Sequence, residues 1–265
     1  MPAVRPATLS ALRRAVSALE PSEAAADAAD RFPLGLAALD GWLGGGLARG
    51  ALHEIYAERV ADAAAAAGFG LGVAARAAGG RPLVWARQDL VGVETGQLHG
   101  AGLAAFGLDP AALILVRVRD PTAALRATAE AARCAAVGAA LVEIWGEPKV
   151  LDLKASRRLA LAASASGVTL VMIRLQAEPA PSAAASRWSV AAAASVPLEA
   201  NAPGRPAFAI TLLRHRAGLG RRSWRLEWDR DSAAFAPSSL HRPVVSVPAH
   251  RPVAAEDGAL WRRAG

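Results

Sequence analysis

The stretch that decides the fold is "GLAALDGWLGGGLARGALHEIY", residues 35–56. Residues 36–43 carry apolar side chains at the spacing of a short helix, and residues 51–56 have the pattern of a strand. Gly44, Gly45 and Gly46 stand between these two parts. Because glycine adopts positive φ freely, we interpret the three glycines as a tight turn, with ligand contact as the alternative. The segment therefore predicts a helix, a turn and a strand in quick succession.

Downstream of this segment, short runs rich in Val, Ile and Leu alternate with helical segments. The sequence predicts helices at about 61–78, 96–107, 121–137 and 152–166, and strands at 82–86, 113–118, 139–145 and 168–175. Near-continuous apolar strands separated by helices are typical of a parallel sheet that is covered on both faces. We therefore expect an α/β fold with a mostly parallel central sheet flanked by helices.

The C-terminal third has a different pattern. Residues 176–206 are rich in Pro, Ser and Ala, which predicts a mobile loop around one short element near 186–194. Residues 207–216 and 221–229 alternate apolar and polar side chains on either side of a turn, so we expect an antiparallel hairpin. The chain beyond Asp231 is Pro-rich and has no sustained period, which indicates a tail.

The N-terminal region predicts a short amphipathic helix at 8–20, followed by a linker that ends at Pro33. The apolar face of this helix, a candidate partner-binding surface, is formed by Leu9, Leu12, Val16 and Leu19. We therefore divide the chain into an N-terminal helix and linker (1–30), a core (31–231) and a C-terminal tail (232–265).

Composition limits the class of protein. A chain of 265 residues, 53% of them hydrophobic, can bury a sizeable core. The single cysteine, Cys134, excludes an internal disulfide framework and a cysteine-rich zinc site, and we interpret it as a small core residue. The N-terminus lacks a signal-peptide block, and the apolar segments are interrupted before the ~20 residues that a membrane span needs. We expect a cytoplasmic protein without a metal site.

The chain is strongly basic, with a net charge of +7 and a pI of about 11. Such a charge permits contact with DNA or with an acidic protein. However, all but two of the 30 basic residues are arginine, a skew that a GC-rich coding sequence also produces. The best candidates for such contacts lie in the predicted hairpin, although a solvated basic face explains them equally well: Arg214, Arg216, Arg221, Arg222 and Arg225.

Sequence motifs for catalysis are missing. A phosphate-binding loop needs the string G-x-x-x-x-G-K-[ST], and the two lysines of this chain, Lys149 and Lys154, do not follow a glycine. The string "GFGLG" at 68–72 lies inside a predicted helix, so close helix packing explains its glycines better than cofactor binding does. There is also no G-x-S-x-G nucleophile elbow. We expect a protein that is not an enzyme and has no cofactor.

Residues 35–56 resemble the RecA-family segment of the form S-L-D-x-x-L-G-G-G-(L/I)-x-x-G-x-(I/L)-x-E-I-Y-G. The chain is similar to the RecA superfamily over about residues 8–230, and within it to the ImuA-type proteins of bacterial SOS mutagenesis cassettes. The resemblance places Ala57 and Asp62 at the two glycines of the phosphate-binding loop. It places Ala63 at the lysine and Ala64 at the hydroxyl that holds magnesium.

Three further positions follow from this resemblance. Arg87 or Gln88 falls where the family has the glutamate that activates water, and Glu143 is the remaining acid at the Walker B strand, where we expect it to form a local ion pair. Arg187 and Trp188 fall in the loop that contacts DNA in RecA, and could offer a cation and an aromatic face to bases. The alternative is a surface loop held by one buried tryptophan.

The resemblance implies a noncatalytic adaptor in SOS-induced, error-prone translesion DNA synthesis. Its expected partners are an ImuB-type polymerase homologue, an error-prone DnaE-type polymerase within the same complex, and RecA, with DNA contact as a further option. A SulA-like inhibitor of cell division is the alternative, because SulA-type proteins also resemble RecA without its phosphate-binding loop. An ATPase with an unorthodox site ranks third, because alanines cannot neutralise phosphate charge.

Overall fold

The computed structural model describes residues 30–241, and the expected N-terminal helix and most of the expected tail lie outside this range. Its main feature is one nine-stranded sheet with the order β11-β10-β9-β8-β3-β7-β6-β4-β5. Its strands are β3 (Leu52–Ala57), β4 (Leu83–Gln88), β5 (Leu113–Val118), β6 (Ala139–Trp145), β7 (Thr169–Leu175), β8 (Ser186–Ala192), β9 (Ala207–His215), β10 (Arg222–Asp229) and β11 (Ala234–Pro237). From β8 to β5 all neighbours are parallel, and β8 to β11 are antiparallel.

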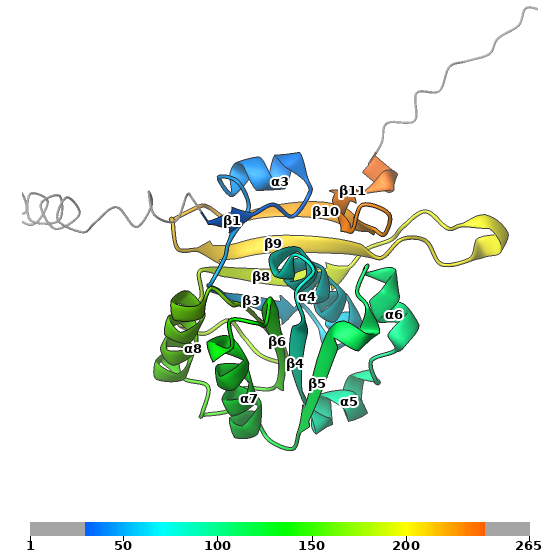
Figure 1. Cartoon of the computed structure of the whole chain (residues 1–265). Coiled ribbons are helices and arrows are strands. Elements are labelled where there is room, and N and C mark those ends of the chain that lie inside the picture. The colour runs from blue at the N-terminus through cyan, green and yellow to red at the C-terminus, as the bar shows by residue number, and fades with distance from the viewer. Residues whose placement is uncertain (1–29, 242–265) are drawn as a thin grey trace, which may run out of the picture.

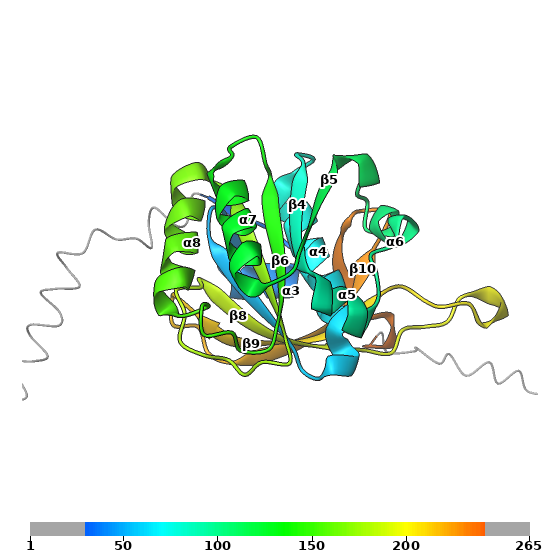
Figure 2. The same ribbon diagram turned by 90° about the horizontal axis from the view of Figure 1, so that it is seen from below.

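Helices cover both faces of the sheet (Figures 1 and 2). They are α3 (Ala37–Trp42), α4 (Ala63–Ala78), α5 (Asp89–Thr95), α6 (Gly100–Ala105), α7 (Pro121–Arg133) and α8 (Leu153–Ser166). Helix α4 packs on one face, and α7 and α8 lie side by side on the other. The expected α/β class, with a mostly parallel sheet flanked by helices and an antiparallel C-terminal hairpin, is confirmed.

The quoted segment folds as its pattern predicts. Gly44, Gly45 and Gly46 all have positive φ, and a Cβ at Gly46 would lie 2.1 Å from the carbonyl oxygen of Phe32. This close approach comes from the pairing of two short strands, β1 (Arg31–Phe32) and β2 (Leu47–Ala48). The turn glycines therefore serve backbone geometry.

Helix α4 is the central core helix. Its glycines allow close contact, since a Cβ at Gly70 would lie 2.9 Å from Ile173 and one at Gly72 would lie 2.6 Å from Phe235. The packing interpretation of "GFGLG" is thus confirmed. The stretch Val60–Ala78 has the length and mean hydropathy, 1.2, of a membrane span, but most of it is buried against the sheet. Its apolar character is explained by that burial.

Several expectations were wrong. Residues 176–206 contain β8, which lies inside the sheet between β3 and β9 rather than in a mobile loop. The sheet also continues past Asp231 into β11, where the tail was expected to begin. Helix α5 was missed, because its seven residues lack an apolar stripe of helical length. Cys134 is exposed just after α7, not part of the core.

Candidate functional site

The segment that follows β3 is fixed by a buried carboxylate. A short 3₁₀ turn at Val60–Asp62 leads into α4, and Asp62 is only 1% exposed. Its Oδ1 accepts a hydrogen bond from the backbone N–H of Ala192 at 2.9 Å, and its Oδ2 accepts one from Arg59 Nε at 2.9 Å. The hydrogen bond from Arg59 is the main reason that the pKa of Asp62 is lowered. The start of α4 therefore already carries a negative charge, which suits the positive end of a helix dipole.

The other residues at the expected phosphate-loop positions offer only methyl groups. Ala57 and Ala63 are buried, and Ala64 is exposed at the start of α4. Beside them, Glu58, Glu147 and Glu178 line a hollow of about 260 Å³ in which Arg59 is the one basic side chain. The surroundings of the turn are thus acidic, and they do not favour a polyphosphate.

Arg87 on β4 and Glu143 on β6 form a buried ion pair on the α4 side of the sheet. The remaining nitrogens of Arg87 are also used, because Nη1 donates to the carbonyl oxygen of Gly96 at 2.7 Å and Nη2 donates to Thr95 Oγ1 at 3.0 Å. Burial raises the pKa of Glu143, and the charge of Arg87 opposes that rise. The expected ion pair of Glu143 is confirmed.

Gln88 takes a different position. Its Oε1 accepts a hydrogen bond from the backbone N–H of Trp145 at 3.2 Å, so it links β4 to β6. Arg87 is therefore the residue whose side chain lies beside α4, at the position where the resemblance places a water-activating glutamate.

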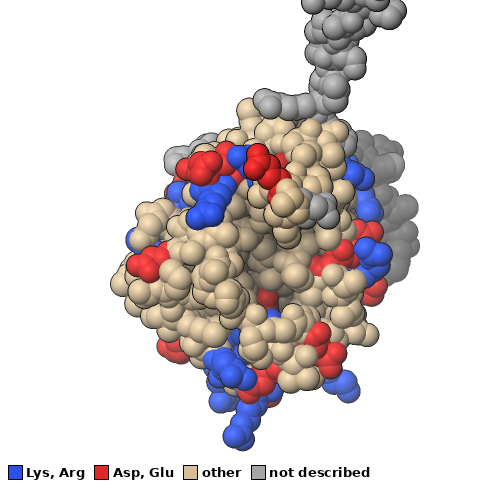
Figure 3. All heavy atoms as spheres, turned by 90° about the vertical axis from the view of Figure 1, so that its right-hand side faces the viewer, with Lys and Arg blue, Asp and Glu red and all other residues tan. Residues whose placement is uncertain are grey.

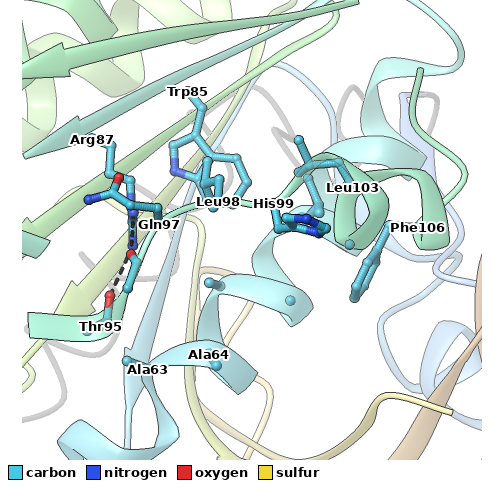
Figure 4. Close-up of a pocket in the computed structure, with 15 residues that line it drawn as sticks. Ala63, Ala64, Trp85, Arg87, Thr95, Gln97, Leu98, His99, Leu103 and Phe106 are labelled. Atoms are coloured by element: carbon cyan, nitrogen blue, oxygen red, sulfur yellow. Dashed lines mark hydrogen bonds between the residues drawn. The ribbon is translucent and has the colours of Figure 1, made fainter. Parts of the chain in front are cut away.

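A pocket of about 200 Å³ lies between the start of α4, the end of β4 and the segment 95–106 (Figure 4). Figure 3 shows the side of the molecule that carries α5 and α6 as a hollowed surface, with mainly uncharged walls. The pocket is lined by Ala63, Ala64, Ala67, Gly68, Leu71, Trp85, Arg87, Thr95, Gly96, Gln97, Leu98, His99, Gly102, Leu103 and Phe106. Trp85 is 1% exposed, and its Nε1 has no hydrogen-bond partner among the described residues.

The sequence did not point to this pocket. Most of its walls are alanine, glycine and leucine, which have the same pattern as an ordinary core. The spacing of Arg59 and Asp62, three residues apart, is the one local signal that the phosphate-loop position is occupied by an ion pair.

Arg187 and Trp188 lie inside the protein, which corrects their assignment as a surface for bases. Arg187 Nε donates to Glu54 Oε2 at 3.0 Å, and its Nη2 donates to Ser182 Oγ at 2.9 Å. Trp188 is fully buried, and its Nε1 donates to Ser186 Oγ at 2.8 Å. Because β8 is an inner strand, its side chains alternate between two covered faces. Through its bonds to Glu54 and Ser182, Arg187 therefore holds the segment before β8 against the sheet.

The arginines expected to contact DNA or an acidic partner are all exposed: Arg214, Arg216, Arg221, Arg222 and Arg225. Four of them lie at or beside the turn that connects β9 to β10, and Arg225 lies farther along β10. The guanidinium of Arg222 lies 4.6 Å from the ring centroid of Trp42 and 5.6 Å from that of Trp224. The turn of the hairpin is thus basic, and Arg222 has two aromatic neighbours.

The remaining candidates lie outside residues 30–241: Leu9, Leu12, Val16 and Leu19. Within the described range, no group of three or more His, Cys, Asp or Glu side chains is arranged to hold a metal ion.

The order and layering of the strands and helices give the chain a RecA-like α/β fold. Among solved structures, the chain is similar to the RadB recombinase, with 14% identity and a TM-score of 0.51 over 78% of this chain and 99% of the other. At this identity the likeness shows the fold alone. No family model matches the chain, and no curated protein matches it.

Proposed function

We propose that this chain is a noncatalytic RecA-like protein that acts by binding partners. The observation that carries the proposal is the buried Asp62 carboxylate at the start of α4. Phosphoryl transfer depends on cations that neutralise the phosphates and on a group that orients the nucleophile. Here a buried carboxylate lies at the N-cap position of α4, bonded to Ala192 N–H and Arg59. Arg87 pairs with Glu143 and donates to two neighbours in the segment 95–96.

The pathway in this proposal comes from the resemblance of the chain, over about residues 8–230, to ImuA-type proteins. The chain would act in the cytoplasm during SOS-induced, error-prone translesion synthesis. It would bind an ImuB-type polymerase homologue, reach a DnaE-type polymerase through that complex, and contact RecA. A RecA-like fold supports a role in DNA repair or recombination in the broad sense.

Two surfaces are proposed for these partners. One is the apolar face expected in residues 8–20, and the other is the basic end of the β9–β10 hairpin with Arg216, Arg221 and Arg222. Exposed arginines without a strong ion pair can bind phosphates or carboxylates bidentately, so the hairpin suits DNA or an acidic protein segment.

The first test is the frequency of ultraviolet-induced mutation in a strain that lacks this chain, compared with the same strain carrying it on a plasmid. Loss of induced mutation that the plasmid restores is expected. Unchanged mutation frequency would overturn the role in translesion synthesis. Filamentation on overproduction would then favour the SulA-like inhibitor.

The second test separates binding from catalysis. Replacing Arg216, Arg221 and Arg222 by serine should weaken capture of the ImuB-type partner or of DNA. The matched control replaces three exposed arginines on the opposite face of the sheet from α4, namely Arg126 of α7 and Arg157 and Arg158 of α8, and should bind normally. Tight, magnesium-dependent binding of ATP by the purified wild-type chain would contradict the noncatalytic assignment.

A further inference from the structure

The turn of the β9–β10 hairpin carries a dense positive charge. Between Ala207 and Leu226 the sequence has five arginines and no Asp or Glu. Within residues 30–241, none of these arginines forms an ion pair. Exposed guanidinium groups bind carboxylates and phosphates well, because their planar fork of donors matches two acceptor oxygens. The described part of the chain therefore leaves this surface without a counter-charge.

The sequence just before the described residues has the opposite charge. Residues 15–30 contain no Lys or Arg, and they contain Glu20, Glu23, Asp27 and Asp30. Asp30 is the one described member of this group, and its Oδ1 lies 3.7 Å from Arg49 Nε. Residues 20–30, named the acidic segment below, thus supply carboxylates that the hairpin lacks.

The acidic segment joins the folded body beside the hairpin. Arg31, the first residue of β1, donates from Nη1 to the carbonyl oxygen of Leu43 at 3.0 Å. The next residue back along the chain, Trp42, has its ring centroid 4.6 Å from the guanidinium of Arg222. Figure 1 shows β1 and α3 lying along β9 and β10. An extended chain covers about 3.3 Å per residue, so the carboxylates at 20–27 are within reach of the basic turn.

We propose that the acidic segment folds back onto the basic turn of the β9–β10 hairpin and covers it until a more highly charged partner displaces it. Single exposed ion pairs are weak, but a tethered segment binds at a high effective concentration, so a few such pairs suffice. The inference rests on the proposed function, which assigns the hairpin to partner binding. It adds that the chain itself regulates access to that surface.

The first experiment measures the contact in the full-length protein with no partner present. A nitroxide spin label is attached at Ser22→Cys in ¹⁵N-labelled protein that also carries Cys134→Ser, which removes the exposed native thiol. The label should broaden the amide signals of residues 216–222. The tether alone brings the label near the turn, so the informative comparison is with a second labelled protein in which the segment is neutral.

The neutral segment carries Glu20→Gln, Glu23→Gln and Asp27→Asn. In this protein the broadening should fall several-fold, because the charges that hold the segment on the turn are gone. The matched control carries Glu256→Gln and Asp257→Asn, the two acids that follow the described range, and should keep the broadening. Equal broadening with the charged and the neutral segment would overturn the proposal.

The second experiment measures what the contact does to binding, with a fluorescent oligothymidylate as the anionic probe. The protein with the neutral segment should bind the probe several-fold more tightly than the wild type. The same neutral segment should give no gain when Arg216, Arg221 and Arg222 are serine, because the covered surface is then absent. Equal affinity of the wild type and the neutral-segment protein, or binding by neither, would overturn the regulatory role.

The two experiments separate this inference from the proposed function. If neutralisation reduces the broadening and tightens probe binding, the acidic segment covers the turn, even where the serine variants of the hairpin capture the ImuB-type partner normally. That last result would count against the proposed partner surface alone. If the hairpin variants lose partner capture but neutralisation changes neither readout, the proposed surface stands and the regulation by the acidic segment is wrong.

Discussion

A single side chain, Asp62, fixes the conformation of the segment that follows β3. A buried carboxylate is unfavourable unless hydrogen-bond donors surround it, and Asp62 has both a backbone N–H from Ala192 and the guanidinium of Arg59. Because Ala192 ends β8, this contact joins the start of α4 to the neighbouring strand. The residue therefore ties the turn before α4 to β8.

Substitution of Asp62 tests this structural role. Asp62→Ala should lower the free energy of unfolding by about 1–2 kcal/mol, because the Ala192 N–H loses its acceptor. Asp62→Asn should cost less, since its amide oxygen can still accept that bond and the Arg59 side chain of the lost ion pair is largely exposed. Urea unfolding of the three proteins measures the difference. Equal stability of the alanine variant and the wild type would contradict the assignment.

His53 is the buried residue whose protonation should be visible in the stability. Its Nδ1 lies 2.7 Å from Ser186 Oγ and its Nε2 lies 2.9 Å from the Ala48 carbonyl oxygen, so Nε2 carries the proton of a neutral ring. Burial lowers the pKa of His53 from 6.5 to about 4. The unfolded chain therefore binds a proton below pH 6.5 that the folded chain binds only near pH 4.

The wild type should accordingly lose stability as the pH falls from 6.5 to 4, and keep it above pH 6.5. The contribution of this one residue is about 3 kcal/mol, on the order of 1.4 kcal/mol for each pH unit. His53→Gln removes the titrating group, so its curve of unfolding free energy against pH should be flatter over this interval. Denaturant unfolding at several pH values gives both curves. Parallel curves would show that His53 does not titrate as its burial indicates.

At the scale of elements, helix α4 and the strands around it were the most predictable part. The parallel strands have continuous apolar runs and the helices between them have glycine or aspartate boundaries, so their positions follow from local pattern. Strand β8 was placed correctly as a short element, but its environment was not. Its sequence "SRWSVAA" contains serine and arginine, and only the pairing of Arg187 with Glu54 reveals why those polar residues are buried.

The glycines of α4 allow a direct test of packing against helix propensity. Gly72→Ala should destabilise the protein by about 1–3 kcal/mol, because the new methyl group meets the rings of Phe235 and Trp228 within 3 Å. Gly41→Ala in α3 meets nothing within 4 Å, so it should gain up to about 1 kcal/mol from helix propensity. Thermal and urea unfolding of both variants provide the comparison. A stabilised Gly72→Ala variant would show that α4 can move away from the sheet.

At the scale of the whole molecule, absence of the phosphate-loop residues could be recognised in the sequence, but what replaces them could not. The pairing of Arg87 with Glu143 joins residues 56 positions apart, and the pocket combines α4, β4 and α6. Such sites depend on which strands become neighbours, and local pattern does not specify that. The same limit explains β11, a four-residue strand whose burial comes from contacts with α4 and β10.

The boundary of the folded unit can be tested with two truncations. Phe235 of β11 is 1% exposed, lies 4.9 Å from Trp228 and 5.2 Å from Phe69 between ring centroids, and its N–H donates to the Leu34 carbonyl oxygen. Removal of residues 232–265 should therefore lower the free energy of unfolding by about 3–5 kcal/mol, the usual cost of deleting a buried phenylalanine. Removal of residues 242–265 spares β11 and should leave the unfolding midpoint close to that of the full chain, as measured by circular dichroism in urea. Phe235→Ala in the full chain should reproduce most of the larger loss.

If both truncations unfold at the same midpoint, β11 does not belong to the core. If their midpoints differ as expected, a loss of partner capture after removal of residues 242–265 reports on binding rather than on folding.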